Sequence, residues 1–220
     1  AFPLQTLKDP GARTAPGVEV VNFYNPERRA PVNTVPGLIG VILTMTMVLF
    51  TAMAIVRERE VGTLEQLNVT PLARWELIVG KLLPYALIGM FDVILVTLVA
   101  VFWFQIPLRG SFPLLFGCSL IYLLSTLGLG LFVSTISQTQ QQASMTATFF
   151  FLTPMIYLSG FTFPIENMPT WIQWVTYLIP LRYFLVIVRG IFLKSVGVAV
   201  LWPQIAALLE VAEGAAWLVD

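Results

Sequence analysis

Residues 35–56 read VPGLIGVILTMTMVLFTAMAIV and contain no charged side chain. A membrane-spanning helix needs about 20 mostly apolar residues, so this run is long enough to cross a bilayer. It ends at four charges of alternating sign, Arg57-Glu58-Arg59-Glu60. The pattern predicts a spanning helix that is followed directly by a polar surface segment.

Three further runs pass the same test, at 82–104, 112–136 and 143–163. We expect Pro154 to kink the last of them. A fifth run, 196–219, is weaker because it contains glutamates, and a charge near a bilayer centre costs a few kcal/mol. These runs predict an all-α, polytopic transmembrane helix bundle with four firm spans and a doubtful fifth.

The composition excludes several classes of protein. Of 220 residues, 57% are hydrophobic and only 11% are charged. Twelve basic and twelve acidic side chains cancel, so the chain lacks the positive charge that nucleic-acid binding needs. The sequence has no histidine, which excludes histidine-based zinc sites and Ser-His or Cys-His catalysis. We therefore expect no metal site and no enzyme activity, and we interpret the single cysteine, Cys118, as a packing residue.

The regions between the apolar runs set the expected orientation. Lysine and arginine favour cytoplasmic loops, and residues 57–81 carry four of them. That segment and the polar run 137–142 are therefore expected on the cytoplasmic side of the membrane.

Residues 1–34, rich in proline, are interpreted as the end of an external domain of a longer protein. Residues 164–195, broken by prolines, are expected to form an external hairpin of two short helices.

Residues 56–84 read VREREVGTLEQLNVTPLARWELIVGKLLP. Val61, Leu64 and Leu67 recur at threefold spacing, which predicts a short amphipathic helix lying on the membrane surface. Thr70-Pro71 would end it, before a second helix enters the membrane. The pattern alone fits an interfacial helix as well as a docking surface for a cytoplasmic partner.

In the predicted hairpin, Thr170 and Gln173 form a capping-box pattern. Crowded aromatic residues follow, as in an interfacial belt, and two arginines seven residues apart share a helix face. The segment fits an external gate or a membrane anchor equally well. The residues concerned are Trp171, Trp174, Tyr177, Arg182 and Arg189.

Two polar features lie inside the predicted spans. Asp92 is an acid deep in the second run, and we interpret it as a substrate-cation or proton site, or as a hydrogen-bonded packing residue. Thr126, Gly130 and Ser134 recur every four residues in the third run. Small faces let helices approach closely, so we interpret this stripe as packing, with a subunit seam or a substrate pathway as alternatives.

Four stretches together resemble the ABC-2-type transporter permeases, the membrane subunits of a class of ATP-driven exporters. The resemblance covers roughly residues 18–203. Its motifs are NFYNPERRAPVNTVPGLIG (22–40), VREREVGTLEQLNVTPLARWELIVGKLLPY (56–85), WFQIPLRGSFPLL (103–115) and LSGFTFPIENMPTWIQWVTYLIPLRYFLVIVRGIFLK (158–194). It implies the second half of a six-span permease in the cytoplasmic (inner) membrane, which lacks the first span and most of the external domain.

The resemblance also implies partners. The segment after the first run would be a coupling helix that sits in a cleft of an ABC ATPase subunit. A second permease subunit, identical or similar, would complete the transporter in the lipid bilayer. The chain lacks a GxxxxGK[ST] loop, so ATP and Mg²⁺ would bind the ATPase and no cofactor would bind here. The expected contact residues are Arg57, Glu58, Arg59, Glu60, Gly62, Thr63, Leu64 and Glu65.

Other functions remain open at this point. One is a transporter or channel that works without an ATPase and uses Asp92. Another is a non-transporting, truncated membrane fragment, which the acidic tail ALLEVAEGAAWLVD favours because permeases of this kind usually end with basic residues. An intramembrane enzyme is the least favoured, because no histidine or lysine lies beside a membrane serine.

Overall fold

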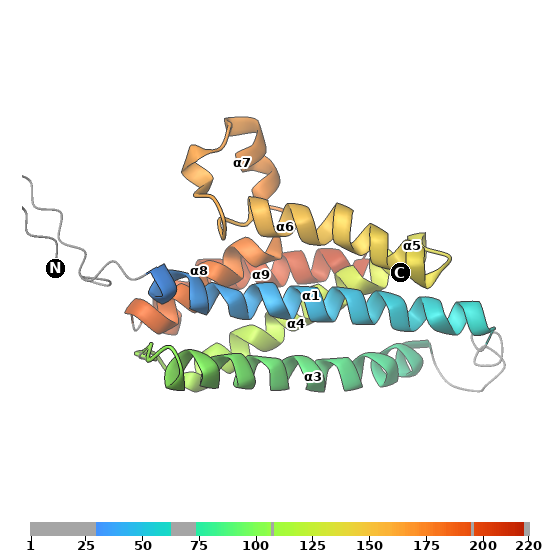
Figure 1. Cartoon of the computed structure of the whole chain (residues 1–220), viewed down its shortest axis with the longest axis horizontal. Helices are drawn as coiled ribbons and strands as arrows, with labels where there is room; N and C mark the ends of the chain where they lie inside the picture. The colour runs from blue at the N-terminus through green and yellow to red at the C-terminus, as the bar shows by residue number, and fades with distance from the viewer. Residues whose placement is uncertain (1–29, 63–73, 107, 195, 218–220) are drawn as a thin grey trace, which may run out of the picture.

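The computed structural model describes residues 30–62, 74–106, 108–194 and 196–217. Those residues form a bundle of helices without a β-strand (Figure 1), which confirms the all-α prediction. Besides the α-helices, the bundle contains a π-helix, η1, and a 3₁₀-helix, η2. In chain order the elements are α1 (Ala30–Val61), α3 (Arg74–Phe102), α4 (Phe112–Ile136), α5 (Gln140–Thr146), η1 (Ala147–Leu152), α6 (Thr153–Leu158), η2 (Ile165–Asn167), α7 (Thr170–Thr176), α8 (Pro180–Lys194) and α9 (Val198–Trp217).

Three helices of the described chain are long and apolar enough to cross a membrane. They comprise Thr34–Val61, Val79–Phe102 and Phe112–Ile136, and correspond to the first three predicted runs. A fourth crossing results only if α7 and α8, bent by 79° at their junction, are counted as one broken span. The predicted count of four firm spans is therefore not confirmed. The doubtful fifth run folds as α9, a single helix of 20 residues.

The run predicted as a fourth span, 143–163, is divided into α5, η1 and α6. The interruption lies just before Pro154, which has no N–H to continue the α-helical pattern. The backbone N–H of Thr153 bonds Thr148 five residues back, as in a π-helix, and the Thr153 hydroxyl donates to the same carbonyl at 2.8 Å. Proline chemistry therefore widens the helix here.

Helix α1 lies at the centre of the bundle and contacts α3, α4, α5 and α8 (Figure 1). Two glycines allow close approach at its crossings. A Cβ on Gly40 would lie 2.7 Å from Leu181 of α8, and one on Gly130 of α4 would lie 2.7 Å from Thr51 of α1. Small residues at crossings are typical of membrane helices, where packing rather than hydrophobic exclusion holds helices together.

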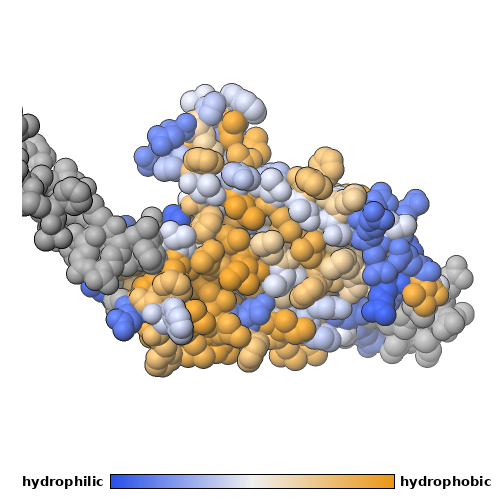
Figure 2. Space-filling view, in the orientation of Figure 1, coloured by the Kyte–Doolittle hydropathy of each residue, from blue (hydrophilic) through white to orange (hydrophobic). Residues whose placement is uncertain are grey.

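Helix α3 lies at the edge of the bundle and exposes an apolar face. Only 28% of its most apolar window is buried, against 56% in α1 and in α4. The exposed side chains recur at fourfold spacing, as expected for one helix face, and include Leu83, Leu87, Phe91 and Leu95. Figure 2 shows apolar side chains along the edge of the molecule where α3 lies. This face suits contact with lipid.

Residues 164–194 fold as η2 followed by two short α-helices, the pair that the prolines predict, and α7 projects from the bundle (Figure 1). The predicted capping box is wrong. The N-cap residue is Pro169, so Thr170 lies one position inside the helix and makes no side-chain cap. The amide of Gln173 instead donates to the Met168 carbonyl at 2.9 Å. The helix therefore starts one residue earlier than the capping-box pattern predicts.

Candidate functional site

The four charges after the first apolar run form the last turns of α1, which ends only at Val61. This corrects the prediction that a separate surface helix begins at these charges. Arginine and glutamate favour helix, so nothing stops α1 before Gly62. That glycine has a φ of +79°, and its N–H bonds the Arg59 carbonyl at 3.2 Å, as is common at helix ends.

The rest of the predicted coupling segment lies outside the described residues. Thr63, Leu64 and Glu65 belong to it, as does the predicted amphipathic helix. The second helix of the segment, α3, begins at Arg74 and runs through Lys81 toward the bundle, as predicted. The described part of the expected contact set is therefore Arg57, Glu58, Arg59, Glu60 and Gly62.

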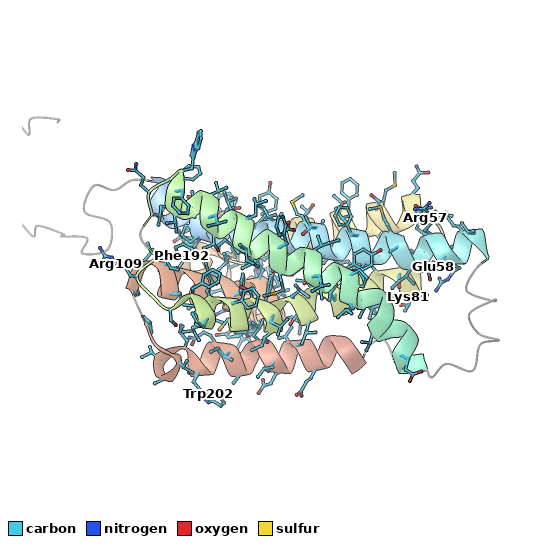
Figure 3. The ribbon with its side chains drawn as sticks, turned by 90° about the horizontal axis from the view of Figure 1, so that it is seen from below. Arg57, Glu58, Lys81, Arg109, Phe192 and Trp202 are labelled. Carbon is cyan, nitrogen blue, oxygen red and sulfur yellow. The ribbon has the colours of Figure 1, made fainter. Side chains whose placement is uncertain are left out.

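Polar contacts join the end of α1 to α3. The half-buried Glu58 carboxylate forms a salt bridge with Lys81 Nζ. Beside it lies a cavity of about 200 Å³ between the two helices, lined in part by Thr51, Glu58, Lys81 and Tyr85. The Thr51 hydroxyl is buried and has no hydrogen-bond partner among the described residues. Figure 3 shows Arg57, Glu58 and Lys81 together at one end of the bundle.

Further contacts join the same helix end to the link between α4 and α5. Arg59 Nη1 donates to the Ser137 carbonyl at 2.9 Å. The Glu60 carboxylate accepts from the backbone N–H of Gln140 at 2.9 Å and from its side-chain amide. The last turns of α1 are thus tied to two other parts of the chain, while Arg57 is exposed.

Sequence reasoning missed the role of Gln140. The run 137–142 was expected on the same side of the membrane as the charged segment, but no contact between them was predicted. Thr139 caps α5 by accepting from the N–H of Gln142 at 3.2 Å, which presents the first helical residue, Gln140, to Glu60. The only signal in the sequence for this contact was that both segments were expected on the same side of the membrane.

Asp92 of α3 is half-buried in the structure and accepts a hydrogen bond from Thr46 Oγ1 of α1 at 3.1 Å. A second polar pair joins α1 to α4. The Thr44 hydroxyl bonds that of Tyr122, and it also donates to the Gly40 carbonyl at 2.6 Å. These bonds satisfy polar groups that would otherwise be costly inside a membrane.

The small-residue stripe of α4 faces α1. Thr126, Gly130 and Ser134 are all buried, and Gly130 abuts Thr51. The Ser134 hydroxyl donates to the Leu131 carbonyl of its own helix at 2.6 Å. The structure therefore places the stripe at a contact within the chain.

The hairpin residues separate into two groups. Trp171 and Trp174 are exposed on α7. Arg182 of α8 holds the end of α7, because its Nη1 donates to the Thr176 hydroxyl and its guanidinium lies 4.0 Å from the centre of the Tyr177 ring. Arg189 is half-buried further along α8, and its Nε has no hydrogen-bond partner in the described part of the chain.

The described residues contain no cluster of three or more cysteine, aspartate or glutamate side chains that could hold a metal ion. The polar contacts at the end of α1 can instead transmit movement, because they join three segments far apart in the sequence.

Comparisons with known proteins agree with this architecture. The model of the family described as "ABC-2 type transporter" matches residues 17–193. The chain is 38% identical over 192 residues to "Probable multidrug ABC transporter permease YbhR" and 40% identical over 194 residues to "Probable multidrug ABC transporter permease YbhS", both of Escherichia coli. Each match covers 87% of this chain and 52% of the relative.

A third relative, "Inner membrane transport permease YhhJ" of Escherichia coli, is 29% identical over 182 residues, which is 80% of this chain and 47% of that protein. The chain thus spans about half the length of the curated relatives it matches. The family match covers most of the chain and includes α1, the polar contacts at its end and the α7–α8 pair. The chain is a multi-pass membrane protein and belongs to the ABC-2 type transporter family.

Proposed function

We propose that this chain is part of the permease subunit of an ABC exporter, which moves substrate across the cytoplasmic (inner) membrane while a separate ABC ATPase hydrolyses ATP. Family membership and the names of the relatives support the transport role. The chain itself would bind no cofactor, and a second permease subunit would complete the assembly. The relatives named as multidrug permeases make drugs the first substrates to test.

The observation that carries the proposal is the bonding of the α1 end. Glu58 joins it to α3, and Arg59 and Glu60 join it to the α4–α5 link. A displacement of this end would therefore move three elements together. In the proposed mechanism ATP binding closes the ATPase subunits and displaces this end, which shifts the permease between inward-open and outward-open populations. The α7–α8 hairpin would lie outside, as a gate or an anchor.

Arg57 offers the cleanest test of ATPase docking, because it is exposed at the α1 end and makes none of the contacts that hold that end. We expect Arg57→Glu to reduce co-purification of the ATPase at least about tenfold, since reversing a charge at an interface costs more than 1.4 kcal/mol. The chain is purified from detergent-solubilised membranes, and the partner is identified by mass spectrometry and by ATP hydrolysis.

The matched control is Arg109→Glu, the same change at the opposite end of the bundle (Figure 3). This variant should retain the ATPase. A second comparison exchanges the pair as Glu58→Lys/Lys81→Glu, which preserves the salt bridge but moves the charge at the helix end. The proposal fails if the parent chain retains no ATPase, or if Arg57→Glu retains as much as the parent.

A further inference from the structure

Cationic and aromatic side chains gather at the end of the bundle opposite Arg57. Arg109, in the loop between α3 and α4, and Lys194, at the end of α8, are both exposed. Trp103 and Trp202 are 82% and 61% exposed. Figure 3 shows Arg109, Phe192 and Trp202 at this end. Exposed indoles are typical of the level of a membrane where lipid headgroups begin.

Backbone hydrogen bonds hold the loop that carries Arg109 against the last turn of α8. The N–H of Gly110 donates to the Ile191 carbonyl at 2.9 Å, and the N–H of Arg109 donates to the Phe192 carbonyl at 3.4 Å. A Cβ on Gly110 would lie 2.7 Å from the Ile191 oxygen, so only glycine permits this approach. The loop that carries Arg109 is therefore fixed against the last turn of α8, which ends at Lys194.

Arg189 adds a third cation to this end of α8. It precedes Lys194 by five residues, which corresponds to about 8 Å along a helix axis. Its Nε is buried without a hydrogen-bond partner among the residues that the structure describes. A guanidinium near a membrane is stabilised by an anion, and phosphate suits it because two N–H groups can bond two oxygens.

The usual distribution of basic residues does not explain these cations. Lysine and arginine normally concentrate on the cytoplasmic side of a membrane protein. The charged end of α1 is the end proposed to face the ATPase, and Arg109 and Lys194 lie at the other end. Cations at an end of the bundle where Phe102, Trp103, Val200 and Trp202 are also exposed match an amphiphile with an anionic head.

We propose that this end binds the phosphate of an anionic phospholipid, with Arg109 and Lys194 contacting the headgroup and Arg189 strengthening the attraction. The acyl chains would lie against apolar side chains that are exposed at this end, such as Phe102 or Val200. This inference needs only the membrane-embedded chain. Its outcome is therefore independent of whether an ATPase binds at the other end.

Native mass spectrometry of the full chain in detergent tests the proposal. The probes are dioleoyl-phosphatidylglycerol, dioleoyl-phosphatidylcholine with the same acyl chains, and inorganic phosphate. We expect the parent chain to retain phosphatidylglycerol at least about tenfold better than phosphatidylcholine, the factor that one charge-assisted hydrogen bond supplies. Arg109→Gln/Lys194→Gln should lose this preference, and Arg57→Gln at the other end should keep it.

Three results would overturn the proposal. One is equal retention of the two lipids by the parent chain, a measurement that does not depend on the folding of any variant. Another is an unchanged preference in the double variant. The third is displacement of phosphatidylglycerol by millimolar inorganic phosphate, which would identify a site for free phosphate instead. Retained circular dichroism of the double variant confirms that its helices persist.

Discussion

Gly130 is the residue at which α4 meets α1. A Cβ there would lie 2.7 Å from the Thr51 Cβ and 3.2 Å from the Val48 carbonyl oxygen, and neither atom can move without displacing α1. We expect Gly130→Ala to reduce the free energy of unfolding by about 1–3 kcal/mol, the usual cost of overpacking. Equilibrium unfolding in mixed detergent micelles, followed by circular dichroism, measures the change.

The control for this substitution lies in the same helix. Gly117 of α4 is exposed, and a Cβ there would meet no atom within 4 Å. Gly117→Ala should therefore leave the stability unchanged or raise it slightly, because alanine favours helix. Equal effects of the two substitutions would mean that helix propensity, and not the α1–α4 contact, determines the result at Gly130.

For single residues, the sequence predicts the kind of interaction a side chain can make better than it predicts which residue it contacts. The fourfold spacing of Thr126, Gly130 and Ser134 predicts a face for close packing, but spacing within one helix cannot say which helix approaches. Asp92 is likewise recognisable as an acid in an apolar run. Its hydrogen bond from Thr46 depends on how α1 and α3 pack, which no local pattern encodes.

The ends of elements are less predictable than their existence. The apolar run of α1 stops at Val56, whereas the helix continues to Val61, because charged residues end a membrane run without ending a helix. The fourth run shows the opposite case. Its hydrophobicity predicts one continuous span. Pro154 lacks a backbone N–H, and the α-helix is interrupted just before it by the π-helix η1.

The joint between α7 and α8 makes a prediction at the scale of elements. Arg182 holds the end of α7 through Thr176 and Tyr177, and the Tyr183 hydroxyl donates to the Tyr177 carbonyl at 2.9 Å. We expect Arg182→Ala to increase hydrogen exchange of the α7 amides at least about tenfold, since a charged hydrogen bond and a cation–π contact are lost. Mass spectrometry of deuterated peptides measures the rate.

Exchange in the buried part of α8 around Ile187 should not change in this variant, because that residue is fully buried in the core. Arg182→Lys is the comparison, since lysine keeps the charge but lacks the planar group that covers the Tyr177 ring, and its exchange should be intermediate. If α7 exchanges equally fast in all three proteins, the Arg182 contacts do not hold it.

For the whole molecule, the sequence predicts the helices but not how they are arranged. Periodicity and length predict most helices, and the arrangement depends on contacts between distant residues. Arg59 meets Ser137 and Glu60 meets Gln140, pairs that lie about 80 positions apart in the chain. Each residue is polar and lies at the edge of an apolar run, so its general position follows from the sequence. The pairing follows only once α1 and α4 pack together.

The described residues form two hydrophobic cores: the larger contains Cys118, and the smaller joins α1, α4, α5 and η1. The thiol side chain is 3% exposed and belongs to a cluster to which α1, α3, α4, α6, α8 and α9 all contribute. A shared core favours cooperative unfolding, because none of these six helices can leave without exposing the others. We therefore expect maleimide labelling of Cys118 and loss of helical circular dichroism to occur at the same denaturant concentration.

A cysteine at an exposed position provides the reference for reagent access. In Cys118→Ala/Ser111→Cys the new thiol lies at the exposed start of α4 and should label in the folded protein without denaturant. If Cys118 labels at that same rate while the helices are intact, the interior opens locally and the core is not one cooperative unit. If its labelling follows the loss of helix, the helices that share this core unfold together, and any rearrangement during transport must move them as packed groups.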